Sequence, residues 1–153
     1  MRAFLFFLGL AVMGAAFPAQ ARDYLPGPVL AKVIGVIDGD TLKVKAKIWL
    51  GQEIETIVRI SNIDAPEMKG RCPFEIERAE LAKATLAQLV GGQEIQLMNI
   101  HTDKYGGRIG ADVTAASGNI AKIMYDKGLV RPYQGKARQP WCPSGSPVQA
   151  ALN

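Results

Sequence analysis

Residues 33–60 read as three β-strands in succession, and this stretch indicates the fold class. The first run is β-branched and ends at Asp38-Gly39, a strong turn signal. The second run alternates apolar residues with three lysines, and a turn near Gly51-Gln52 leads into the third. The lysines on one face are Lys43, Lys45 and Lys47. They have the spacing to contact phosphates, but any half-exposed strand alternates in this way, and we favour a solvated face.

The second half of the chain predicts two helices and two more strands. Pro73 suits the first position of a helix that runs to about Val90, where two glycines follow. Its core-facing stripe is expected to be Ala79, Ala82, Leu86, Leu89 and Val90. The other elements are strands at residues 94–100 and 108–114 and a short helix at 120–127, capped by Asn119. Five short strands with exposed turns fit an α+β domain built on a small closed barrel.

The N-terminus has the pattern of a secretory signal peptide. Arg2 precedes an uncharged apolar stretch, and Pro18-Ala19-Gln20-Ala21 offers a cleavage site after Ala21. The alternative is a membrane anchor, but a spanning helix needs about 20 apolar residues and this run is shorter. We therefore expect an exported protein, periplasmic or secreted, with no membrane contact after cleavage.

The remaining residues suffice for one domain. We expect residues 1–21 to be the signal peptide, 22–31 an extension, 32–133 the barrel domain and 134–153 an irregular tail. The net charge of +4 is compatible with a polyanionic partner but does not establish one, because no dense Lys/Arg stripe is present.

Cys72 and Cys142 are the only cysteines. An exported chain meets an oxidising compartment, and two cysteines permit one pairing within the chain. There is no Cys-x-x-Cys and only one histidine, His101, so few residues are available to bind zinc or to form a thiol–imidazole catalytic pair. We expect a structural Cys72–Cys142 disulfide.

The candidate chemistry lies in two acidic segments at the ends of strand-like runs. Asp38 is explained by the turn, which leaves Asp40 without a structural reason. Asp64-Ala65-Pro66-Glu67 imitates a helix N-terminus, but Gly70 and Pro73 would stop that helix within about one turn. A functional role for these carboxylates is the better explanation.

These residue types suit a hard cation and a phosphate. Asp64 and Glu67 flank a proline-fixed bend, so one carboxylate can bind a cation while the other holds water. Carboxylates, a main-chain carbonyl and waters favour Ca²⁺, with Mg²⁺ as the alternative. Arg59, at a strand end, requires a carboxylate partner or a ligand.

Three blocks together resemble the thermonuclease (staphylococcal-nuclease-like) family over about residues 32–133. They are Val36-Ile-Asp-Gly-Asp-Thr41, Arg59 with Ile63-Asp-Ala-Pro-Glu67, and Asp103-Lys-Tyr-Gly-Gly-Arg108, and the segment ending in Gly128-Leu-Val130 also fits. The resemblance implies an oligonucleotide/oligosaccharide-binding (OB) barrel and a monomeric, Ca²⁺-dependent enzyme. Its substrates would be DNA and RNA, preferentially single-stranded, cleaved without strong sequence or sugar specificity to leave 3′-phosphate ends.

The resemblance also implies a role for each site residue. The metal would be bound by the carboxylates of Asp40 and Asp64 and the main-chain carbonyl of Ala65. Glu67 would orient or deprotonate the attacking water, and Arg59 and Arg108 would bind the phosphate. Nucleotide contacts would come from Lys104, Tyr105 and Tyr133.

The sequence departs from the family pattern in three places. Ala65 stands where a threonine is common, which is neutral if only the carbonyl acts. The Gly106-Gly107 pair is one glycine longer than the shortest family form, and a register slip there would turn Arg108 away. The tail is too short for a terminal helix, and Cys72–Cys142 is the expected substitute. The rival functions are a catalytically silent nucleic-acid-binding OB module and a structural Ca²⁺ domain.

Overall fold

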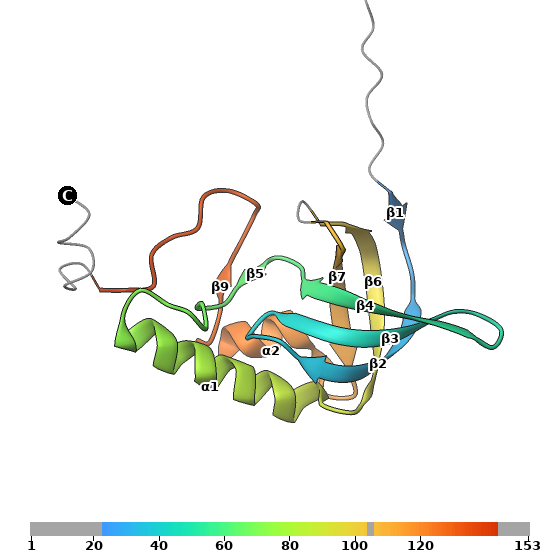
Figure 1. Ribbon diagram of the computed structural model, residues 1–153, viewed down its shortest axis with the longest axis horizontal. Coiled ribbons are helices and arrows are strands. Elements are labelled where there is room, and N and C mark those ends of the chain that lie inside the picture. The colour runs from blue at the N-terminus through green and yellow to red at the C-terminus, as the bar shows by residue number, and fades with distance from the viewer. Residues whose placement is uncertain (1–22, 104–105, 144–153) are drawn as a thin grey trace, which may run out of the picture.

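The computed structural model describes residues 23–103 and 106–143. Figure 1 shows a sheet that curls into a barrel, with both described helices along one side of it. The elements are β1 (Tyr24–Leu25), β2 (Val29–Val36), β3 (Thr41–Trp49), β4 (Gln52–Ile60), β5 (Ile63–Asp64), α1 (Pro73–Val90), β6 (Glu94–Thr102), β7 (Arg108–Ala115), β8 (Gly118–Asn119), α2 (Ile120–Asp126) and β9 (Arg131–Pro132).

Five strands close the barrel. Short connections make β2, β3 and β4 an antiparallel meander, and β6 pairs antiparallel with both β2 and β7. A parallel pairing of β4 with β7 completes the ring. The expected α+β fold, a five-stranded OB-type barrel with two helices, is therefore confirmed. Closure leaves the barrel strands without a long free edge.

The first barrel strand begins earlier than expected. The β-branched run starts at Val33, but β2 starts at Val29, because the four preceding residues already pair with β6 from Val29↔Leu97 to Lys32↔Glu94. Its buried alternation accordingly begins at Ala31. Residues 29–31, which were expected to belong to the extension, are therefore part of the barrel.

The connection between β2 and β3 packs against α1. It covers residues 37–40, so it is longer than the two-residue hairpin that Asp38-Gly39 suggests. A Cβ on Gly39 would lie 2.7 Å from Cβ of Ala82 and 2.8 Å from Cβ of Ala65. Glycine is therefore required here for close approach, and this approach sets Asp40 against the loop that follows β5.

The core fills the barrel and the space beneath the helices. α1 buries Ala79, Ala82, Leu86 and Val90, as its predicted stripe requires, and leaves Leu89 partly buried. Asn119 caps α2 by accepting a hydrogen bond from the Lys122 amide at 2.9 Å. Each fully buried Leu, Ile or Val side chain contributes about 1.5–3 kcal/mol, so the barrel is a rigid frame for its loops.

The lysines of β3 lie on the outer surface of the barrel, with Lys43 and Lys47 exposed and Lys45 half-buried. Lys43 pairs with Glu55 of the adjacent β4 at 3.0 Å, and both side chains are half exposed. This arrangement agrees with a solvated face. Within residues 23–103 and 106–143, neither helix is long and apolar enough to cross a membrane.

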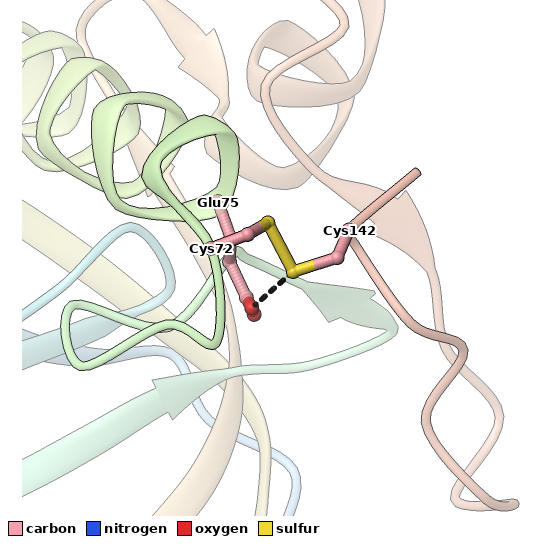
Figure 2. A group of neighbouring side chains, drawn as sticks. All are labelled: Cys72, Glu75 and Cys142. Atoms are coloured by element: carbon pink, nitrogen blue, oxygen red, sulfur yellow. Dashed lines mark hydrogen bonds between the residues drawn. A yellow bond between two sulfur atoms is a disulfide. The ribbon is translucent and has the colours of Figure 1, made fainter. Parts of the chain in front are cut away.

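A disulfide between Cys72 and Cys142 joins the start of α1 to the tail, as predicted. Figure 2 shows the bond at the first turn of α1, with the Glu75 carboxylate beside it. Residues 134–143 have no helix or strand; in Figure 1 they form a loop beyond the end of β9 and return toward the segment that precedes α1. The signal peptide, Lys104, Tyr105 and residues 144–153 lie outside the described residues.

Candidate active site

Asp40 is buried at the end of the β2–β3 connection. The Asp38 side chain accepts a hydrogen bond from the Asp40 amide at 3.1 Å, which confirms Asp38 as a turn residue. Asp40 Oδ1 lies 2.6 Å from Arg59 Nη1, and its Oδ2 accepts a hydrogen bond from the Ala65 amide at 2.8 Å. The Asp40 carboxylate thus links β4 to the loop after β5.

Burial raises the pKa of Asp40 from 3.8 to about 6, although the Arg59 guanidinium opposes the rise and Asp38 adds to it. The reason is that the protein interior replaces the water that would stabilise the ionised carboxylate. A carboxylate held ionised in such a place gains most from an added positive charge. Its environment therefore suits a cation ligand.

Asp64 ends β5, which pairs with β9 in a second, two-stranded sheet that the sequence did not predict. Asp64 Oδ2 accepts a hydrogen bond from Trp141 Nε1 at 3.2 Å. Oδ1 is buried and accepts no hydrogen bond from the described part of the chain; it forms ion pairs with Arg138 Nε at 2.5 Å and with Arg59 Nη2 at 3.6 Å. Asp64 Oδ1 thus faces positive charge, which is the kind of partner that a bound cation would also supply.

A side chain of α1 holds the loop after Asp64 in place, and this loop does not begin a helix. Glu75, in the first turn of α1, accepts hydrogen bonds from the amides of Glu67 at 3.3 Å and Arg71 at 2.9 Å. A Cβ on Gly70 would meet Glu75 Cγ at 2.6 Å, so glycine is required there. The Glu67 side chain is 53% exposed and points toward Arg138. Glu75 therefore positions the backbone from which Glu67 projects.

A cavity of about 630 Å³ opens beside Arg59. Asp103, His101 and Tyr133 also line it, and the Tyr133 ring lies 6.0 Å from Arg59 Cζ. Arg108, at the start of β7, donates from Nε to Asp103 Oδ2 at 2.9 Å, so it is linked to this cavity through its partner. The cavity thus combines two charged groups and an aromatic ring.

The structure gathers most of the predicted site. Asp40, Arg59, Asp64 and Ala65 are joined by direct contacts, and Glu67 joins them through Arg138. Arg108 is linked to the cavity through its pairing with Asp103, and Tyr133 lines the cavity. The two carboxylates and the Ala65 carbonyl form an all-oxygen set, which fits a hard divalent cation.

Four residues escaped the sequence reasoning. His101 lies over Gly110, where a Cβ would clash with its ring. Glu75 is recognisable afterwards as an acidic residue in the first turn of a helix. Arg138 and Trp141 come from the irregular tail, and their only signal was their position shortly before Cys142.

A second cluster is not a metal site. Ligand atoms of Cys72, Glu75 and Cys142 lie within 4.8 Å of one another. However, the two sulfurs are bonded to each other, so neither is available as a thiolate ligand. The dashed line in Figure 2 joins Cys142 Sγ to Glu75 Oε2 at 3.5 Å, and it is a packing contact because a disulfide sulfur carries no proton.

Comparison with known families gives one match. A family model described as staphylococcal nuclease homologue matches residues 57–142, which is more than half of the chain. The match includes Arg59, the Asp64–Glu67 loop, Arg108 and both cysteines, and it begins after Asp40. A comparison with curated proteins found no match.

Proposed function

Because the chain belongs to the staphylococcal nuclease homologue family, we propose that it is an exported, calcium-dependent nuclease that hydrolyses phosphodiester bonds in DNA and RNA. Nuclease activity is the general property of this family, and its members generally use a divalent metal. The choice of Ca²⁺, with Mg²⁺ as the alternative, and the breadth of substrate are our proposal.

The observation that carries the proposal is the all-oxygen cluster at the end of β5. Asp40 and Asp64 are 2% and 4% exposed, and Ala65 directly follows Asp64 and donates its amide to Asp40. Buried carboxylates are costly without positive partners. In the cation-free structure Arg59 compensates Asp40 and Arg138 pairs with Asp64, and a bound Ca²⁺ would compensate both carboxylates at once. When bound, the cation would neutralise the phosphate and stabilise negative charge in the transition state.

The other residues have roles that follow from their position. Glu67 is the exposed carboxylate of the group, and we assign to it the orientation or deprotonation of the attacking water. Arg59 lines the cavity, and Arg108 pairs with Asp103, which also lines it. Both guanidinium groups are suited to bind the phosphate and to stabilise the charge that develops on it.

The cavity supports a preference for single-stranded substrate. An unpaired base can stack on the Tyr133 ring while its phosphate reaches Arg59. A paired base offers no free face for that contact. We also propose 3′-phosphate products, no strong preference for sequence or sugar, and a monomer.

Export is a further part of the proposal. The pattern of residues 1–21 predicts secretion to the periplasm or the medium, and it lies outside the described residues. The Cys72–Cys142 disulfide supports this location, since such bonds persist in oxidising compartments.

The test is incubation of the purified protein with DNA and with RNA, in Ca²⁺, in Mg²⁺ and in chelator. We expect both substrates to be cleaved in Ca²⁺ and neither in chelator. Glu67→Gln should reduce turnover by about 10²–10⁴-fold, the usual effect of a positioned base. Glu80→Gln is the matched control, because Glu80 is an exposed residue of α1. Binding without cleavage would favour the silent OB module, and chelator-resistant cleavage would exclude the metal.

A further inference from the structure

Arg138, from the irregular tail, contacts two of the three groups that the proposed function assigns to the cation, and it also contacts the proposed base. Its Nε lies 2.5 Å from Asp64 Oδ1, and its Nη2 donates to the Ala65 carbonyl at 2.8 Å. Its Nη1 contacts Glu67 Oε1. The Arg138 guanidinium thus binds two proposed ligand atoms and also contacts the proposed base.

The tail is fastened on both sides of Arg138. On one side, the Tyr133 amide donates to the Asn62 carbonyl at 2.9 Å, next to the pairing of β9 with β5. On the other side, Cys142 forms the disulfide and Trp141 donates to Asp64. Arg131 strengthens this side, since its Cζ lies 3.8 Å from the centroid of the Trp141 ring and its Nη1 donates to the Pro140 carbonyl. The tether keeps the guanidinium at a high local concentration beside the acidic cluster.

We propose that Arg138 is an internal competitor of the divalent cation and sets the affinity of the site for it. This inference rests on the proposed function. A cation at Asp64 Oδ1 and the Ala65 carbonyl would occupy the position of the guanidinium, and two positive groups cannot share it. The Arg138 side chain is 38% exposed, so it can withdraw into solvent. A hollow of about 390 Å³ lined by Asp64, Ala137 and Gln139 provides space beside it.

The first experiment measures Ca²⁺ affinity by isothermal titration calorimetry. The variants are Arg138→Gln and Lys136→Gln, which removes the same charge from an exposed position of the same tail segment. If the cation must displace Arg138, the apparent dissociation constant contains the cost of opening. We expect Arg138→Gln to bind Ca²⁺ about tenfold more tightly than the unmodified protein, which is the gain if Arg138 leaves the site open in about one molecule in ten. Lys136→Gln should change the affinity much less. Equal effects of the two substitutions overturn the proposal.

The second experiment detects displacement directly, without measuring activity. Phenylglyoxal modifies accessible arginines, and peptide mass analysis reports each site separately. Ca²⁺ should increase the modification of Arg138 and leave that of the exposed Arg71 unchanged. Unchanged modification of Arg138 in saturating Ca²⁺ overturns the proposal while a Ca²⁺-dependent nuclease stands. Absence of Ca²⁺ binding in every variant overturns both the competition and the proposed metal.

Discussion

Loss of the Cys72–Cys142 disulfide should destabilise the fold substantially. The bond joins positions 70 residues apart. Closing a loop of that length restricts the unfolded chain by about 4 kcal/mol in the entropy model, as an upper figure. In a domain of this size, 1 kcal/mol corresponds to about 3–5 °C in melting temperature. We therefore expect reduction to lower the melting temperature by up to about 12–20 °C.

Reduction should also slow cleavage, through a specific chain of contacts. Cys142 Sγ packs 3.5 Å from Glu75 Oε2, and the Glu75 carboxylate holds the amides of Glu67 and Arg71. Loosening that contact loosens the backbone from which Glu67 projects. A misplaced base reduces turnover even when the metal site is saturated. The cleavage rate in saturating Ca²⁺ should therefore fall.

The assay is a thermal melt of the protein with and without reductant, with the cleavage rate measured in parallel. The control is the double variant Cys72→Ser, Cys142→Ser, on which reductant has no bond to act because the chain has no other cysteine. Thiol titration of the unfolded, unreduced protein tests whether the Cys72–Cys142 disulfide is present. Two reactive thiols per chain would refute the disulfide and the stability argument built on it.

Two further predictions concern the charged groups. Arg59→Lys and Arg108→Lys should each reduce cleavage strongly while the fold survives, because lysine keeps the positive charge but lacks the directed fork of a guanidinium. Wild-type cleavage by Arg108→Lys would show that this side chain does not bind the phosphate. Because the pKa of Asp40 is raised to about 6, its contribution to the stability of the cation-free fold is greatest below about pH 4 and is lost as the pH rises through about 6. Ca²⁺ needs the ionised form, so the Ca²⁺-induced rise in melting temperature should be larger at pH 7 than at pH 5, and equal rises would contradict this ligand assignment.

Local signals in the sequence predicted the elements well. The limits of α1 follow from Pro73 and from the glycines after Val90, and the cap of α2 follows from Asn119, because these residues act on neighbouring backbone. The barrel followed from the number and length of the strands. The disulfide followed from the count of cysteines, which left a single pairing.

Long-range contacts could not be predicted in this way. Gly39 was interpreted as a turn residue, yet its essential role is to let the loop of Asp40 approach Ala82 and Ala65. Likewise, the early start of β2 depends on partners in β6, which are remote in sequence. Neither feature leaves a local pattern, because the backbone that requires it comes from another part of the chain.

The kinds of group in the site can be read from the residues alone: carboxylates at strand ends, an arginine that needs a partner and a proline-fixed bend. Which of these groups meet depends on the folded chain. It set Asp40 on Arg59 and Ala65, placed Glu75 beneath the loop of Glu67, and brought Arg138 over the acidic cluster. The physical reason is that charge and propensity are properties of single residues and their neighbours, whereas coordination depends on distances that only closure of the barrel and anchoring of the tail establish.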